Sequence, residues 1–115
     1  MFNRELTTQQ KRIESLYDRE IRVAVYKVTN QWLLPFLPIS YCRADKKFQS
    51  IRIFVGMENN SENLKIIEDF NKKYLNFISK ELINVKKFRR IPKLIFQIDN
   101  ELIEINKLEE LVKNS

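Results

Sequence analysis

The stretch from Phe88 to Asn100, which reads FRRIPKLIFQIDN, constrains the fold of this chain more than any other. After Pro92, residues alternate between two faces, and this period of two predicts a β-strand. A proline has no N–H to donate, so the start of a strand suits it. Ile95 adds an apolar side chain to the more polar face, which is typical of an inner strand or of one that a helix partly covers. Asp99 and Asn100 end the strand with turn-forming side chains.

Basic residues surround the entrance to this strand. They are Lys86, Lys87, Arg89 and Arg90, and Lys93 follows inside the strand. Arginine can hold a phosphate through two parallel hydrogen bonds, whereas lysine supplies a point charge. We therefore interpret the stretch as a sheet strand that brings a basic patch to the surface.

The composition indicates one small domain over residues 1–115. Of these 115 residues, 43% are hydrophobic, which is enough to form a buried core. One glycine and three prolines argue against a turn-rich sandwich or barrel. The net charge of +6 is a moderate sign of nucleic-acid binding, although a merely soluble basic protein would also show it.

Patterns that carry catalysis or bind metals are missing from the sequence. It has no histidine, no nucleophile–base set, no zinc-ligand spacing and no glycine-rich phosphate loop. Its single cysteine, Cys42, cannot form an internal disulfide and is expected to be a small buried apolar group. We predict neither an enzyme nor a protein with a cofactor or metal. The polar amino terminus and the lack of a long apolar run predict a soluble, intracellular protein without a membrane contact.

Helical and strand periodicities predict the order of the elements. The expected elements are a helix from about residue 8 to Val28, a hairpin of Ile39–Ala44 and Gln49–Gly56, helical stripes at Leu64–Phe70 and Leu75–Val85, the strand after Pro92, and a terminal helix over Leu102–Val112. Thr7 or Thr8 is expected to cap the first helix, and Ser61 the second. The two helical stripes form either two helices or one bent helix. This order predicts an α+β domain with helices on one face of a small sheet.

The linker from Trp32 to Pro38 is unusually apolar, and its two prolines break regular structure. We expect it to pack against the sheet or the first helix. The alternative is an exposed patch that binds a partner.

The order of elements, together with the residues from Phe77 to Leu111, resembles ribosome-binding factor A, a family of bacterial and organellar assembly factors. The family pattern is an aromatic–aliphatic pair, a Glu-Leu, basic residues before a proline, and a strand that ends in aspartate. The matching residues are Phe77-Ile78, Lys80-Glu81-Leu82, Phe88-Arg89-Arg90-Ile91-Pro92, Leu94-Ile95-Phe96 and Asp99. Asp45 in the hairpin turn and the strand from Ile51 to Val55 also fit the family pattern.

The resemblance implies a KH-like fold of the second type. Its order is helix–strand–strand–helix–kink–helix–strand with a C-terminal helix, and the helices pack on a small mixed three-stranded sheet. The implied function is binding of the immature small ribosomal subunit and its RNA during late maturation of ribosomal RNA. Such a protein has no catalytic activity, is a monomer when free, and works in the cytoplasm or an organelle. It contacts RNA through basic residues and lacks the Gly-x-x-Gly loop of ordinary KH domains.

Twelve basic residues are candidate RNA contacts. They are Lys86, Lys87, Arg89 and Arg90 before the last strand, Lys72 and Lys73 between the two helical stripes, Lys46 and Lys47 in the hairpin turn, and Lys11, Arg12, Arg19 and Arg22 on the first helix. No exposed aromatic residue can be identified, so base stacking is not indicated. Recognition of the shape and backbone of the RNA is expected instead.

The interhelical kink departs from the family pattern, which has a small Ala-x-Gly there. The aligned residues are Tyr74-Leu75-Asn76. Asparagine tolerates left-handed backbone better than most residues, so we predict a positive φ at Asn76 in place of a glycine. Tyr74 is larger than the residue that the pattern has at its position.

Two other classes of function compete with RNA binding. One is an adaptor that docks a protein partner through the apolar linker 32–38, with the basic residues serving solubility. The other is a DNA-binding helix–turn–helix module, which the expected sheet disfavours.

Overall fold

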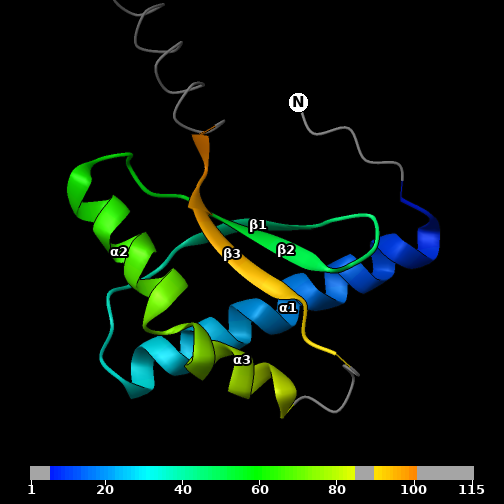
Figure 1. The fold of residues 1–115 in the computed structure, drawn as a ribbon, viewed down its shortest axis with the longest axis horizontal. Coiled ribbons are helices and arrows are strands. Elements are labelled where there is room, and N and C mark those ends of the chain that lie inside the picture. Colours follow the sequence, from blue (N-terminus) through cyan, green and yellow to red (C-terminus); the bar gives the residue numbers. More distant parts are fainter. Residues whose placement is uncertain (1–5, 85–89, 101–115) are drawn as a thin grey trace, which may run out of the picture.

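The structure is a computed structural model that describes residues 6–84 and 90–100. Its elements are α1 (Thr8–Gln31), β1 (Ile39–Ala44), β2 (Ser50–Val55), α2 (Ser61–Lys72), α3 (Leu75–Ile83) and β3 (Lys93–Ile98) (Figure 1). The described part of the chain is therefore an α+β fold, and the predicted order of its elements is confirmed. The predicted C-terminal helix and the candidate residues Lys86, Lys87 and Arg89 lie outside the described residues.

The strands form a mixed sheet in the order β1-β2-β3. β1 and β2 are antiparallel, which confirms the hairpin, and β2 and β3 are parallel. A parallel pair needs a crossover connection, and α2 and α3 supply it. In the part of the chain that the structure describes, β3 is an edge strand, so its interpretation as an inner strand is wrong. The other possibility, partial cover by a helix, describes β3 correctly.

A side chain of α2 closes the free edge of β3. The amide oxygen of Asn71 accepts a hydrogen bond from the Phe96 N–H at 2.8 Å, and its amide nitrogen donates to the Phe96 carbonyl at 3.0 Å. Asn71 thus pairs with the strand as a neighbouring backbone would. An exposed edge invites pairing with other chains, and this contact blocks the middle of the edge.

Side chains of α1 close the opposite edge of the sheet, along β1. Glu14 and Asp18 accept hydrogen bonds from the N–H groups of Ala44 and Cys42, at 2.9 and 3.0 Å. Arg22 donates to two carbonyls at the start of β1, those of Ile39 and Ser40, at 2.7 Å each. The three side chains are four residues apart, which places them on one face of the helix. α1 is therefore fixed to the sheet by polar contacts as well as by apolar packing.

The core lies between the sheet and the helices. From β3, the side chains of Leu94, Phe96 and Ile98 are buried, as their alternation predicts. Phe70 of α2 packs against Phe96 with ring centroids 5.7 Å apart. The other largest fully buried side chains come from α1, β1, β2 and α3: Ile21, Val28, Cys42, Ile51, Ile53, Val55, Ile78 and Leu82.

The helix starts follow from side-chain caps. Thr7 caps α1 in a capping box with Gln10, as predicted for one of the two threonines. The prediction of Ser61 as the cap of α2 is wrong by one residue. Asn60 is the cap, because its side-chain oxygen accepts the N–H of Asn63 at 2.8 Å.

α2 and α3 are two helices rather than one bent helix. Their break falls at Lys73 and Tyr74, and Tyr74 has φ −104° and ψ −4°. Asn76 lies inside α3, so the prediction of a positive φ at this residue is wrong. The ring of Tyr74 packs edge-on against Phe70, with centroids 5.3 Å apart. Aromatic packing thus accommodates the large side chain at the kink, and no residue there has a left-handed backbone conformation.

The apolar linker is partly packed and partly exposed. Leu37 is buried and Leu34 packs against the core, which confirms the expected packing for part of it. Trp32 stacks on Phe77 of α3 at 5.0 Å, yet half of its surface remains accessible. Leu33 is 92% exposed and Phe36 is 75% exposed.

Candidate nucleic-acid interface

Three segments that are far apart in the sequence meet at one end of the sheet. Gln10 of α1 donates to the carbonyl of Lys46 in the hairpin turn at 3.3 Å. Tyr17 of α1 donates to the carbonyl of Arg90 at 3.4 Å, and its ring stacks on Phe48 of the turn. The first half of α1, the hairpin turn and the entrance to β3 are therefore neighbours.

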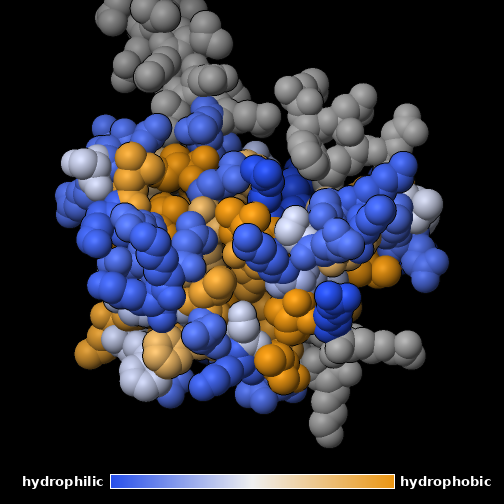
Figure 2. Space-filling model, in the orientation of Figure 1, coloured by the Kyte–Doolittle hydropathy of each residue, from blue (hydrophilic) through white to orange (hydrophobic). Residues whose placement is uncertain are grey.

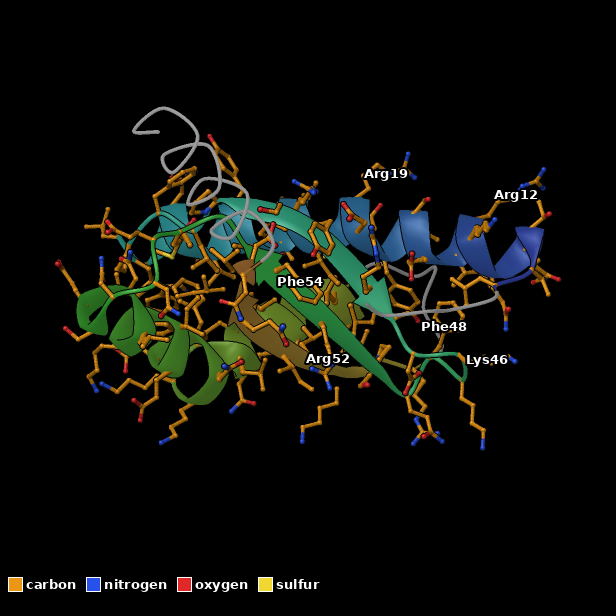
Figure 3. All side chains as sticks on the ribbon, turned by 90° about the horizontal axis from the view of Figure 1, so that it is seen from above. Arg12, Arg19, Lys46, Phe48, Arg52 and Phe54 are labelled. Carbon is orange, nitrogen blue, oxygen red and sulfur yellow. The ribbon has the colours of Figure 1, made fainter. Side chains whose placement is uncertain are left out.

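This convergence gathers six exposed cations, which we call the basic end. They are Lys11 and Arg12 of α1, Lys46 and Lys47 of the hairpin turn, and Arg90 and Lys93 at the entrance to β3. Arg12 and Lys46 lie at the same end of the molecule in Figure 3. Within residues 6–84 and 90–100, none of the six belongs to an ion pair. The basic end therefore carries positive charge that nearby carboxylates do not neutralise by direct contact.

Two carboxylates on the segments that form the basic end accept hydrogen bonds from the hairpin. Asp45 accepts the N–H of Gln49 at 2.7 Å and the hydroxyl of Ser50 at 3.3 Å, which fixes the hairpin turn. Glu14 accepts the N–H of Ala44 at the edge of β1. These contacts direct the two acidic side chains to backbone and hydroxyl groups of the hairpin.

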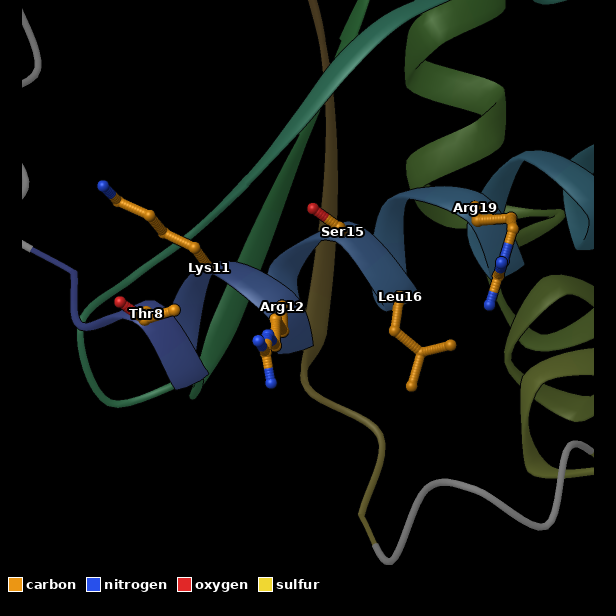
Figure 4. A pocket seen from close by; sticks show the side chains of 6 residues that line it. All are labelled: Thr8, Lys11, Arg12, Ser15, Leu16 and Arg19. Carbon is orange, nitrogen blue, oxygen red and sulfur yellow. The ribbon is translucent and has the colours of Figure 1, made fainter.

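A shallow hollow of about 420 Å³ runs along the outer surface of α1. It is lined by Thr8, Lys11, Arg12, Ser15, Leu16 and Arg19 (Figure 4). Arg12, Leu16 and Arg19 point to the same side of the helix, because they are spaced by one helical turn each. Arg19 thus extends the positive surface from the basic end along α1. An anion that follows the helix would meet two guanidinium groups in succession.

Arg22 does not belong to this surface, although it was predicted to contact RNA. Its guanidinium pairs with Asp18 at 2.5 Å and donates to the two β1 carbonyls described above. A phosphate would have to displace partners that hold α1 to the sheet. The sequence shows the charge of Arg22, but it cannot show that its guanidinium donates hydrogen bonds to the edge of β1.

Lys72 and Lys73 also differ from the prediction, because carboxylates of α2 pair with them. Lys72 lies 2.8 Å from Glu68, and Lys73 lies 3.6 Å from Asp69, which also contacts Lys65. The hydrogen bond between Lys72 and Glu68 lowers the pKa of the carboxyl and raises the pKa of the amine. The junction of α2 and α3 lies away from the hairpin turn (Figure 1). The structure thus does not bring these two lysines to the basic end.

Figure 2 shows how polar and apolar side chains share one face of the molecule. Hydrophilic residues cover α2 and the first half of α1, and hydrophobic residues lie between them, around β3. The polar cover on α2 contains paired charges of both signs, whereas the first half of α1 carries cations of the basic end. The two polar regions therefore differ in electrostatic character despite their similar hydropathy.

Sequence reasoning missed a second group of side chains, on the outer face of the sheet. Arg43, Arg52, Tyr41 and Phe54 lie there, on the strands of the hairpin. Residues alternate along β2, so Arg52 and Phe54 lie opposite the core residues Ile51, Ile53 and Val55. The sequence alone did not show the register between β1 and β2, which brings the rings of Tyr41 and Phe54 together.

Two further observations concern the described residues only. No three His, Cys, Asp or Glu side chains gather there in a group that could hold a metal ion. None of the helices described there combines the length and the apolar character needed to cross a membrane. A scan against models of protein families and a search of curated proteins find no match for this chain.

Proposed function

We propose that this protein is a non-catalytic assembly factor that binds RNA of the immature small ribosomal subunit, as ribosome-binding factor A does. The observation that carries the proposal is the basic end, where three distant segments expose six cations without ion-pair partners among the described residues. Such a cluster suits a phosphate backbone better than scattered, paired surface charge does.

The chemistry of the basic end fits backbone recognition. Lysines 11, 46, 47 and 93 supply point charges, and Arg12 and Arg90 can bind phosphate oxygens in a bidentate manner. Lys86, Lys87 and Arg89 come immediately before Arg90 in the sequence, so the segment that leads into the basic end is also basic. Neutralising phosphates releases condensed counterions, which drives binding without sequence-specific contacts.

The fold supports the proposed family through its order of elements. A helix, a hairpin, two helices and a parallel third strand follow the order of elements that the resemblance implies. The break between α2 and α3 at Tyr74 is compatible with the interhelical kink that the resemblance implies. The single glycine of the chain excludes a Gly-x-x-Gly loop, so side chains rather than such a loop would contact the RNA.

Sedimentation with small-subunit particles tests the proposal with two matched variants. One variant replaces three lysines of the basic end, Lys11, Lys46 and Lys47, with glutamine. The other replaces Lys65, Lys72 and Lys73, which lie on α2 or at its end near Glu68 and Asp69. Both variants lose the same net charge.

We expect the basic-end variant to bind particles at least about tenfold more weakly and the α2 variant to bind almost as wild type does. Equal losses in the two variants would show that only total charge matters, and the basic end would then have no special role. Full binding by the basic-end variant would refute the proposal.

A second candidate function is a protein-binding adaptor, and the exposed part of the linker favours it. Phe36 and Tyr26 line a hollow of about 330 Å³ between α1 and the linker, and both are more than half exposed. Nuclease treatment before purification separates the two functions. An RNA-binding factor loses its ribosomal partner after this treatment, whereas an adaptor keeps its partner and loses it only when Leu33 and Phe36 are replaced with serine.

A further inference from the structure

The outer face of the sheet is open among the described residues. Ile51, Ile53 and Val55 of β2 point into the core, so Arg52 and Phe54 between them point to the opposite side. Figure 3 looks onto this side, with α1 along the β1 edge and α2 along the β3 edge. Among the described residues, the helices therefore flank the sheet or lie beneath it, and none of them covers this face.

Strand pairing brings planar and cationic side chains together on the open face. Tyr41 of β1 stands opposite Phe54 of β2, which stands opposite Gln97 of β3. The next row contains Arg43 and Arg52. Lys93 opens the same face at the first residue of β3, at the border of the basic end.

Three of these side chains form one continuous stack. The rings of Tyr41 and Phe54 are 4.6 Å apart and inclined by 24°. The guanidinium carbon of Arg43 lies 4.4 Å from the centre of the Tyr41 ring. Arg52 donates to the side-chain oxygen of Gln97 at 3.2 Å, which holds its guanidinium across β2 and β3. The structure forms these contacts without a ligand, and a preformed surface lowers the conformational entropy that its side chains lose on binding.

The side chains on this face indicate which class of ligand it could bind. Aromatic rings and guanidinium planes are the groups on which unpaired bases stack, and nearby cations hold the adjoining phosphates. The acidic residue at the end of β3, Asp99, is buried and accepts a hydrogen bond from Tyr41 at 3.5 Å. An anionic, planar ligand therefore meets three cations and two aromatic rings on this face. Double-stranded RNA fits less well, because its bases are already stacked within the helix.

We propose that the open sheet face stacks unpaired bases of single-stranded RNA, while the basic end holds the phosphate backbone. This inference rests on the proposed function in taking RNA as the ligand. It adds that the RNA segment is single-stranded and that contact with its bases contributes to affinity. The stack end at Phe54 and the guanidinium of Arg43 are the groups that receive bases.

Fluorescence anisotropy with two RNA probes tests the inference. One probe is an oligouridylate of about ten nucleotides, and the other is an abasic oligomer of the same length and charge. The wild type should bind the oligouridylate more tightly. Phe54→Leu removes the ring but keeps an apolar side chain, so it should weaken oligouridylate binding about tenfold and leave abasic binding unchanged. Phe36→Leu, the same change on the exposed linker, is the control and should alter neither.

The outcomes separate this inference from the proposed function. A wild type that binds both probes equally, or a folded Phe54→Leu variant that keeps the full preference for bases, overturns the inference. Arg43→Lys gives the same test if Phe54→Leu fails to fold, since it removes a stacking plane and keeps the positive charge. Particle binding that depends on the basic end would in those cases leave the proposed function intact. A wild type that binds neither particles nor either RNA overturns both.

Discussion

At the scale of single residues, Leu33 combines an exposed side chain with an unfavourable backbone conformation. It follows the end of α1 with φ +52°, in the left-handed region where glycine is usual. The next residue, Leu34, donates to the carbonyl of Thr29 at 2.9 Å, which completes a Schellman-type helix end. The left-handed conformation costs a non-glycine residue roughly 1–2 kcal/mol. An exposed leucine gives back little of this cost by burial.

Leu33→Gly should therefore raise the free energy of unfolding by about 0.5–1 kcal/mol, as measured by urea denaturation. Lys27→Gly, in the exposed face of α1, is the matched control and should lower it by a similar amount, because glycine has poor helix propensity. A loss of stability in Leu33→Gly would show that the leucine side chain, rather than the backbone conformation, determines stability at this position.

Cys42 provides a second prediction at this scale. Burial, with a smaller contribution from the charge of Asp18, raises the pKa of its thiol from about 9 to about 12. The thiol ionises in the unfolded chain first, so its contribution to stability is complete below pH 9 and is lost as the pH rises toward 12. Between pH 8 and pH 10, the wild type should lose about 1.4 kcal/mol more stability than Cys42→Ala. Equal losses in the two proteins would contradict this assignment.

At the scale of elements, polar side chains bind the backbone groups at both edges of the sheet. α1 closes the β1 edge through Glu14, Asp18 and Arg22, and α2 closes the β3 edge through Asn71. Sequence periodicity predicted the strands, the hairpin and the helices, because apolar patterning determines them. It did not predict that β3 is an edge strand. Its apolar outer residue Ile95 suggested either an inner strand or one partly covered by a helix. The hydrogen bonds between Asn71 and Phe96 join residues 25 positions apart, so local periodicity cannot show them.

Asn71→Ala tests the contribution of this edge contact. It leaves the N–H and the carbonyl of Phe96 without their protein partner at a partly buried site, so the free energy of unfolding should fall by about 1–3 kcal/mol. Asn76→Ala changes an exposed asparagine of α3 and should leave stability within about 0.5 kcal/mol of the wild type. Thermal or urea unfolding measures both. An unchanged stability in Asn71→Ala would mean that water replaces the amide at no cost.

At the scale of the whole molecule, the candidate site was only partly predictable. Lys11, Arg12, Lys46, Lys47 and Arg90 were selected from charge, and the structure gathers them at one end. Charge alone could not separate these five residues from Arg22, which donates hydrogen bonds to the edge of β1. It also could not separate them from Lys72 and Lys73, which form ion pairs with Glu68 and Asp69. The open sheet face escaped sequence reasoning because its aromatic stack exists only after β1 and β2 pair.

The two proposed surfaces predict different salt dependences of RNA binding. Each phosphate contact at the basic end releases counterions, so replacing Lys11, Lys46 and Lys47 with glutamine should flatten a plot of log affinity against log salt by about 2–3 units of slope. Phe54→Leu removes a stacking plane without removing charge. It should lower the whole line by about one log unit and keep its slope.

Titrations of the oligouridylate from 50 to 300 mM salt measure both effects. If the triple variant gives a line parallel to the wild type, its lysines do not contact phosphate. If Phe54→Leu changes the slope, the aromatic face acts by positioning cations rather than by stacking bases.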